Sequence, residues 1–529
     1  MTSLFSLLLS LALLSLSFLT TAVSASEFTF QEATIESIHL AFAQNRLTSR
    51  QLVDFYLDRI QTLNPSLRCV LEVNPDALAQ ADEADRLRAE ARGGKGTLGN
   101  LHGIPVLLKD SIGTDDKMNT SAGSYALLGA RVPRDAFVVE RLRSAGAVIL
   151  GKASMSEWYS IRSWEMPRGW CARGGQGVNP YVKSENPCGS STGSAIAVAA
   201  NMVTVSLGTE TDSSIICPAD HNSVVGFKPT VGLTSRAGVM LVSPRQDSIG
   251  PISRTVSDAV YVLDAIVGFD PRDEATGEAA KFIPMGGYKQ FLREDGLKGK
   301  RLGIVRNPFS NSRGSTAASI FDQHLGTFRN YGATLVDNLE IENIDIILNP
   351  SKNGEMGVLR AHFKHHINEY LGELSNSPVK SLADVIAFNS NNPDLEKMEE
   401  YNQDGLIAAQ MANILDEEVV KAEHMMKKLS EEGFEKLMKE NELDAMVTLG
   451  LRAATVLAFE GYPALTVPAG YDDNGMPFGV CFGGLKGSEA KLIEIAYSFE
   501  QATRMRKPPL SFSSEFHYQY YYEQSYGTM

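Results

Sequence analysis

An alternation of short apolar strands with helical segments between residues 104 and 265 constrains the fold of this chain more than any other feature. The pattern contains strands at 104–108, 147–151 and 203–208 and helices at 136–144 and 194–201. Short apolar runs that alternate with helical patterns are typical of a sheet whose faces are covered by helices. We therefore predict an α/β fold.

Strand patterns return in the second half of the chain. They lie at 301–306, 333–336 and 444–482, and a closing helix is predicted at 488–504. Residues 352–440 are instead mostly helical and highly charged. Because one sheet can take strands from both sides of this stretch, we predict a central mixed twisted β-sheet covered by α-helices on both faces. It forms a single domain over residues 26–529, with a helical insertion at about 340–440.

The N-terminal segment favours export. Residues 1–26 carry no charged side chain, Leu4–Leu19 is an apolar run, and small residues stand at Val23 and Ala25. This pattern is typical of a secretory signal peptide over residues 1–25, cut near Ala25. We therefore expect a secreted, extracellular protein without stable membrane insertion. The alternative is a retained anchor, because the uncharged stretch is long enough to cross a bilayer.

Composition excludes several classes of function. The chain has 49 Lys and Arg against 63 Asp and Glu, a net charge of −14, so we expect no nucleic-acid partner. Its Gly/Ser-rich loops match neither the phosphate-binding nor the dinucleotide-binding pattern, and we expect no cofactor and no metal. Five Cys are too few for a disulfide scaffold. Cys188 and Cys217 are expected to be small buried thiols, with pairing as the alternative, and Cys69 and Cys171 could also pair.

Two Gly/Ser/Thr-rich segments, PCGSSTGS (187–194) and GTETDSSI (208–215), belong to a longer series of motifs. The other motifs, in chain order, are LHGIPVLLKD (101–110), TSAGS (120–124), GKASMSEW (151–158), GFKPT (226–230), GLTSR (232–236) and GYPALTVPAG (461–470). With this series the chain resembles the amidase signature family over nearly all of residues 30–507. The GTETD motif and RGGQ (173–176) are most similar to the peptide-amidase branch.

The resemblance implies a Ser-cisSer-Lys triad. Lys109 matches the catalytic lysine, Ser190 matches the serine held by a cis peptide bond, and Ser214 matches the nucleophile, 24 residues after Ser190. The backbone N–H groups of Thr211, Asp212, Ser213 and Ser214 match the oxyanion hole. A serine hydroxyl needs a base to take its proton. A lysine can be that base when burial lowers its pKa, and Lys109 follows an apolar strand.

The function that the resemblance implies is amide hydrolysis. We expect a secreted amidase that cleaves a carboxamide C–N bond of a neutral or peptidic amide to an acid plus ammonia or an amine, through an acyl-enzyme. Its partner is a small-molecule or peptide amide substrate, and the protein is a monomer or homodimer. Relatives often carry Arg two or three residues after the nucleophile, where this chain has Ile216 and Cys217. A neutral substrate is therefore favoured over an anionic one.

Ser213 departs from the family, whose members usually have Gly before the nucleophile. If this position requires a positive φ, a serine costs about 1–2 kcal/mol relative to glycine. The alternative function is therefore a catalytically impaired amidase-fold binding or scaffold protein. A tRNA amidotransferase subunit of the same fold is a third alternative, disfavoured by the signal peptide.

Three histidines in the predicted insertion, His362, His365 and His366, share a helical spacing that could suggest a metal site. No Cys or carboxylate pattern accompanies them, so we expect solvated helix residues.

Overall fold

The computed structural model describes residues 28–94, 96–309 and 314–510. Its centre is an 11-stranded mixed sheet in the order β1-β3-β2-β6-β8-β7-β12-β13-β11-β9-β10, and a separate two-stranded sheet pairs β4 with β5. The strands are β1 (Val70–Val73), β2 (Pro105–Lys109), β3 (Val148–Ala153), β4 (Trp170–Cys171), β5 (Gly175–Gln176), β6 (Val205–Glu210), β7 (Val225–Lys228), β8 (Ser248–Ser253), β9 (Arg301–Ile304), β10 (Thr334–Val336), β11 (Ala445–Leu449), β12 (Ala464–Tyr471) and β13 (Pro477–Gly483).

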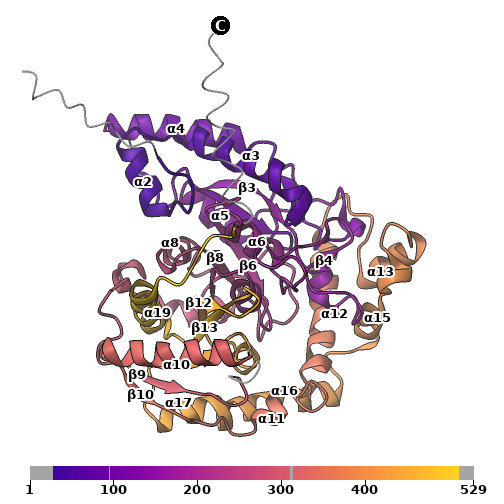
Figure 1. The fold of residues 1–529 in the computed structure, drawn as a ribbon. Coiled ribbons are helices and arrows are strands. Elements are labelled where there is room, and N and C mark those ends of the chain that lie inside the picture. Colours follow the sequence, from indigo (N-terminus) through magenta and orange to yellow (C-terminus); the bar gives the residue numbers. More distant parts are fainter. Residues whose placement is uncertain (1–27, 95, 310–313, 511–529) are drawn as a thin grey trace, which may run out of the picture.

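Helices surround this sheet (Figure 1). The α-helices are α2 (Ile35–Ala43), α3 (Ser49–Leu67), α4 (Ala77–Arg92), α5 (Phe137–Ser144), α6 (Thr192–Ala199), α7 (Ile216–His221), α8 (Val256–Ile266), α9 (Ala275–Ala279), α10 (Gly314–Asn330), α11 (Ile344–Ile347), α12 (Glu355–Glu373), α13 (Leu382–Asn391), α14 (Met398–Tyr401), α15 (Asp404–Met411), α16 (Glu417–Ser430), α17 (Lys436–Glu440), α18 (Ala454–Ala458) and α19 (Glu489–Thr503). Among the described residues, no helix combines the length and apolar composition needed to cross a bilayer.

The sheet is covered on both faces. Successive residues of a strand point to opposite faces, and the buried residues of β13 divide accordingly. Val480 and Phe482 pack in a core cluster with helices α8, α10 and α19, whereas Cys481 packs in another cluster with α16, α17 and α18. The predicted α/β class, a large mixed sheet flanked by helices, is therefore confirmed.

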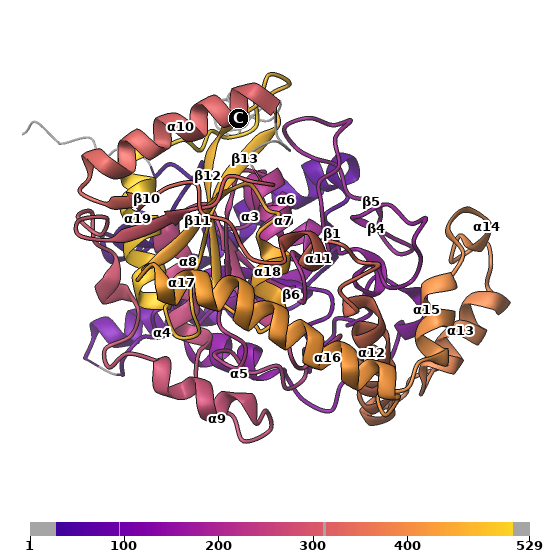
Figure 2. The ribbon, with the colours of Figure 1, turned by 90° about the horizontal axis from the view of Figure 1, so that it is seen from below.

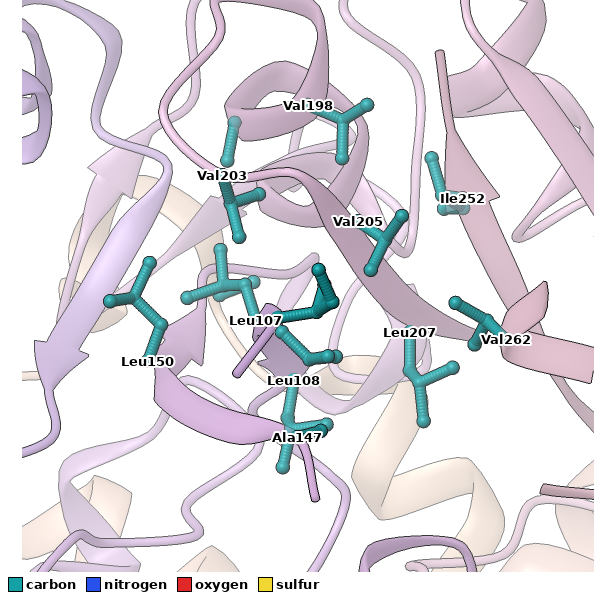
Figure 3. Packing of buried hydrophobic residues seen from close by; sticks show 14 of the residues in the cluster. Leu107, Leu108, Ala147, Leu150, Val198, Val203, Val205, Leu207, Ile252 and Val262 are labelled. Carbon is teal, nitrogen blue, oxygen red and sulfur yellow. The ribbon is translucent and has the colours of Figure 1, made fainter. Parts of the chain in front are cut away.

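Strand β2 runs through the most buried part of the sheet. It pairs in parallel with β3 on one side and with β6 on the other, and all five of its residues are buried. Figure 3 shows Leu107 and Leu108 of β2 in an apolar core with Leu207 of β6 and Val198 of α6. A strand buried on both faces reads as a continuous apolar run. Lys109 is the last residue of β2 and directly follows these apolar residues.

Helices α11 to α17 fill the chain between β10 and β11, and α12, α13 and α15 form a lobe at one side of the molecule (Figure 2). A buried ion-pair network fastens this lobe to the body. Arg162 lies 2.6 Å from Glu157 and 3.1 Å from Glu396, and none of the three side chains is exposed to solvent. The segment that contains Glu396 thus has a fixed position against the turn that contains Glu157. The predicted signal peptide lies outside the described residues.

Candidate active site

Lys109 ends β2 with its amine inside the protein. Its Nζ lies 2.8 Å from Ser190 Oγ, 2.8 Å from Thr209 Oγ1 and 3.0 Å from the Thr209 carbonyl oxygen. Burial lowers the pKa of Lys109 well below its usual value, and the carboxylates of Asp247 and Glu210 only partly oppose this effect. The amine is therefore more easily neutral than that of a surface lysine, with hydroxyl groups rather than a carboxylate in hydrogen-bond contact.

Ser190 lies in the loop that precedes α6. The peptide bond between Gly189 and Ser190 is cis, and the Ser190 side chain is buried against Lys109. The next residue, Ser191, has another task, because its Oγ donates to the Thr209 carbonyl and accepts from the Thr209 N–H. The loop thus presents Ser190, and not Ser191, to the lysine.

Ser214 lies in the turn between β6 and α7. Its Oγ is 3.5 Å from the carbonyl oxygen of Asp212, a long contact, and no hydrogen bond joins it to Ser190. The two segments are nevertheless adjacent, because the Ser191 N–H donates to the Ser214 carbonyl at 3.1 Å. Ser190 and Ser214 line the same cavity, of about 170 Å³. Catalytic hydrogen bonds are often long before substrate binds.

A disulfide between Cys188 and Cys217 ties the two serine segments together, with Cα atoms 5.9 Å apart. The expectation of two buried thiols was therefore wrong, and the pairing alternative holds. Cys69, Cys171 and Cys481 are free and buried, so Cys69 and Cys171 do not pair. Spacing along the chain could not distinguish these arrangements, because pairing depends on whether the fold brings the Cα atoms within about 7 Å.

The turn 211–214 carries the predicted oxyanion hole. Among the described residues, none of its four backbone N–H groups donates to an acceptor. The carboxylate of Glu210 instead accepts from the next two N–H groups, those of Ile215 and Ile216, at 2.6 and 2.8 Å. Ser213 has a φ of 63°, so the strain expected for a serine at this position is present. Its Oγ donates to the Asp212 carboxylate at 2.6 Å.

The cavity walls come from two distant parts of the chain. Trp164 and Arg168 follow the turn η2 (Glu157–Ser160), and Glu355 and Arg360 lie on α12. The Arg360 guanidinium lies 5.1 Å from the centre of the exposed Trp164 ring. Burial, with the neighbouring charge of Asp212, raises the pKa of Glu355 to about 8. Arginine side chains and a carboxyl group of raised pKa thus border the site.

Sequence reasoning missed Glu355 and Thr209. Glu355 stands at the start of a charged helix, where a carboxylate is usually solvated. Thr209 resembles any β-branched strand residue. The cavity is lined in part by residues within 159–168 and 355–360.

The three histidines of α12 differ from one another. His362 is buried, with Nδ1 2.9 Å from Ser243 Oγ and Nε2 3.1 Å from Glu423, so its prediction as a solvated residue was wrong. His365 is exposed and His366 half-buried, and Glu369 lies 3.3 and 3.1 Å from their rings. The possible ligand atoms of His365, His366 and Glu369 lie within 4.8 Å of one another. One exposed helix face supplies all three, which is a weak arrangement for a metal.

The chain is similar over most of its length to proteins that are named as amidases. A family model described as Amidase matches residues 51–449. A relative from Arabidopsis thaliana, named "Probable amidase", is 59% identical over 485 residues, which cover 92% of this chain and 93% of the relative. Native peptide amidase from Stenotrophomonas maltophilia has a TM-score of 0.84 at 41% identity, covering 91% of this chain and 99% of that one. An amidase family protein from Bacillus anthracis has the same TM-score at 33% identity, with 94% and 97% covered.

Proposed function

Because this chain belongs to the amidase signature family and is a hydrolase of amide C–N bonds, we propose that it works through an acyl-enzyme on Ser214. Lys109 is the base and Ser190 relays the proton. One observation carries this proposal: the amine of Lys109, fully buried and without a carboxylate in contact, lies 2.8 Å from Ser190 Oγ. A buried amine that meets a hydroxyl group is suited to accept its proton.

The contacts of Lys109 support the direction of proton transfer. A neutral amine has two N–H donors and one lone pair. The two oxygens of Thr209 can accept both donors, at 2.8 and 3.0 Å. The lone pair is then directed to the hydroxyl hydrogen of Ser190. Ser190 passes its proton to Lys109 and takes the proton of Ser214.

The reaction then follows acyl-transfer chemistry. Ser214 Oγ turns from the Asp212 carbonyl toward Ser190, loses its proton and forms a bond to the amide carbon. The negative charge that develops on the carbonyl oxygen is stabilised by the N–H groups of the turn 211–214, and one such donor is worth roughly 3–4 kcal/mol. The C–N bond breaks as the nitrogen takes the proton back through Ser190. Water attacks the ester carbon and gives one proton to the same relay. The bond between Ser214 Oγ and the acyl carbon then breaks, Ser214 Oγ takes that proton back through Ser190, and the acid is released.

A neutral or peptidic amide is the proposed substrate class. At neutral pH a carboxyl with a pKa of about 8 is protonated, so Glu355 can donate one hydrogen bond and accept others, as a peptide group requires. Its Oε1 already accepts from Gln246 at 2.8 Å. The hydrophobic Ile216 and the disulfide-bonded Cys217 stand where relatives carry arginine. The likeness to a peptide amidase supports the same class.

Secretion is proposed on two observations. The sequence pattern of residues 1–25 is typical of a signal peptide, and the Cys188–Cys217 disulfide fits an oxidising compartment. The test is the N-terminal sequence of the protein recovered from culture medium, expected to begin near Ser26. Retention of an intact N-terminus in the membrane fraction contradicts secretion and supports the anchor.

The catalytic proposal is tested with a fluorophosphonate probe and a peptide amide. Wild-type protein is expected to gain one label on Ser214, located by peptide mass, and to release ammonia from the amide. Ser214→Ala abolishes both, and Lys109→Ala slows labelling by about 100-fold or more. Circular dichroism confirms that each variant is folded.

Folded wild type that takes no label contradicts the activated serine. That result favours the catalytically impaired binding or scaffold protein, for which the strained Ser213 is the specific observation. The variant Ser213→Gly then shows whether Ser213 itself causes the loss of labelling. If the glycine variant is labelled, Ser213 is the cause; if it is not, the cause lies elsewhere in the site.

A further inference from the structure

A second cavity, of about 490 Å³, lies between the N-terminal helices α2 and α4 and the helix α8. The loop 98–102 and the turn η4 (Lys289–Phe291) complete its wall. It shares no lining residue with the cavity at Ser214. The loop 98–102 precedes β2 and Lys109 ends it, so the two cavities lie at opposite ends of this strand. The volume is within the range of small-ligand sites, about 300–1,000 Å³.

The charges that line this cavity are all positive. Arg88, Arg92 and Lys289 contribute cations and His39 and His102 contribute imidazoles, and none of the described residues in the wall is a carboxylate. The protein as a whole carries a net charge of −14, so this local excess of cations runs against the composition. Such concentrated charge attracts anions.

Two of the cations form no ion pair, although the Asp264 carboxylate lies near Lys289 and accepts from its backbone N–H. Arg88 pairs with Asp85 at 2.5 Å, which offsets its charge. Arg92 instead donates to neutral oxygens, Asn45 Oδ1 and the Phe42 carbonyl. Within residues 28–94, 96–309 and 314–510, neither Arg92 nor Lys289 forms an ion pair. An anion in the cavity would supply the missing partner.

Aromatic rings form the apolar part of the wall and hold two of the cations. The Arg88 guanidinium lies 3.7 Å from the centre of the Phe42 ring, and Lys289 Nζ lies 4.3 Å from the centre of the Tyr261 ring. Leu98, 41% exposed, adds an aliphatic surface. A ligand that fills the cavity therefore needs an apolar body as well as a charge.

His39 lies among these groups, and its pKa is sensitive to their positive charge. Its ring is 6.1 Å from that of Tyr261, and it has no hydrogen-bond partner among the described residues. Burial lowers its pKa to about 4, and the charges of Lys289, Arg88 and His102 contribute. An unpartnered imidazole in a positive field can donate to an incoming anion once it is protonated.

We propose that this cavity binds an amphipathic organic carboxylate, with its head group near Lys289, Arg92 and His39 and its apolar body against Phe42, Tyr261 and Leu98. One negative charge is sufficient, because Asp85 already offsets Arg88 and the other two cations are exposed. The proposal does not depend on the reaction at Ser214, because the two cavities are separate.

The experiment is calorimetric titration of the full chain with octanoate, 1-octanol and inorganic phosphate, at low salt and pH 7. We expect octanoate to bind with a Kd below about 1 mM, at least 10-fold more tightly than octanol. Phosphate should not compete at the same concentration, because it lacks the apolar body. Equal binding of octanol and octanoate, competition by phosphate, or no saturable octanoate binding overturns the proposal.

Variants locate the site. Lys289→Glu should weaken octanoate binding by at least 10-fold, and Lys289→Arg should retain it. Lys298→Glu is the matched control, because it reverses one exposed lysine charge outside the wall. Unchanged binding in Lys289→Glu, or an equal loss in Lys298→Glu, places octanoate elsewhere and overturns the assignment.

A second readout comes from His39. In a pH titration followed by NMR of the imidazole, octanoate should raise the pKa of His39, because a nearby anion favours the protonated ring. His39 signals that octanoate leaves unmoved contradict the proposal, even if octanoate binds.

Discussion

Lys109 and Lys152 lie in neighbouring parallel strands, and their surroundings differ. Both side chains are fully buried, and burial lowers the pKa of both. Lys152 donates to the Ile112 carbonyl at 2.6 Å and to Thr120 Oγ1 at 2.8 Å, in a loop just after β2. Lys109 instead contacts a serine and a threonine from other parts of the chain.

The charges around the two amines explain what each can do. Four carboxylates, led by Asp110, oppose the effect of burial on Lys152, and its pKa is about 8. Asp247 and Glu210 do so for Lys109, whose pKa burial lowers well below the usual lysine value. Lys152 is thus mainly charged at neutral pH and stabilises a loop, whereas Lys109 is suited to be a base. Burial is thus common to both lysines, and the difference lies in the carboxylates and hydroxyl groups around each amine.

Replacing each lysine in turn should give the largest contrast. Lys109→Met is expected to lower kcat/KM for a peptide amide by about 10³–10⁴-fold, because the base is lost, with little loss of stability. Lys152→Met removes one of two cations, with Arg173, near the buried charge of Asp110. It should cost about 3 kcal/mol in urea unfolding, and the folded fraction should keep its rate. If folded Lys152→Met protein cannot be labelled at Ser214, the proposed difference between a base, Lys109, and a structural lysine, Lys152, is wrong.

The Cys188–Cys217 disulfide belongs to the surroundings of Lys109, because it joins the segment of Ser190, which contacts Lys109, to the segment of Ser214. It closes a loop of 29 residues that contains both Ser190 and Ser214. In the chain-entropy description, replacing both cysteines by alanine should cost roughly 3–4 kcal/mol in unfolding free energy, and labelling of Ser214 should slow. Cys69→Ala, at a free buried cysteine, is the control. Full stability without the disulfide contradicts its role in holding the two serine segments.

The pH dependence of Ser214 labelling tests whether the Thr209 hydroxyl, which contacts Lys109, acts differently from the Thr120 hydroxyl, which contacts Lys152. The rate should fall as pH drops through the pKa of Lys109, below the usual lysine value of about 10.4. Because the folded pKa is lowered, the folded state binds fewer protons between the two pKa values, and acid also reduces stability there. Thr209→Val removes an acceptor of the ammonium form. It should move the acid limb to lower pH and reduce the plateau about 10-fold.

Thr120→Val is the matched change beside Lys152 and should leave this profile in place. If both valine variants shift the profile equally, the hydroxyl of Thr209 has no special role in orienting Lys109.

The smallest expected difference is between two glycine variants that relieve backbone strain, Ser213→Gly and Ala122→Gly. Ser213 has a φ of 63°, and Ala122, two residues after the Thr120 that contacts Lys152, has a φ of 50°. Ser213→Gly removes strain but also adds unfolded-state entropy, so stability should change by less than about 1 kcal/mol. Labelling should speed up if the side chain narrows the oxyanion hole. Ala122→Gly should leave the labelling rate unchanged, and an equal acceleration in both variants refutes an effect local to Ser213.

The fold class could be predicted from sequence because strand and helix periods differ strongly over residues 104–265, and the mixed sheet confirms it. The motif order also picked out Lys109 and Ser190, which the structure brings into contact. Thr209 and Glu355 could not be found in this way, because their importance depends on neighbours 100 or more residues away. The Cys188–Cys217 pair, 29 residues apart, could not be decided from sequence either, because pairing depends on how close the fold brings the two Cα atoms.

The packing of α7 against β12 and β13 has a consequence for biosynthesis. The helix after Ser214 packs against β12 and β13, and the Asp220 carboxylate accepts from the Gly479 N–H, 259 residues later in the chain. At about 5–20 residues per second, a ribosome takes roughly 13–50 s to make that stretch. The segment that contains Ser214 therefore lacks these contacts until β12 and β13 have been synthesised. A nascent or prematurely terminated chain holds Ser214 without the support that fixes it.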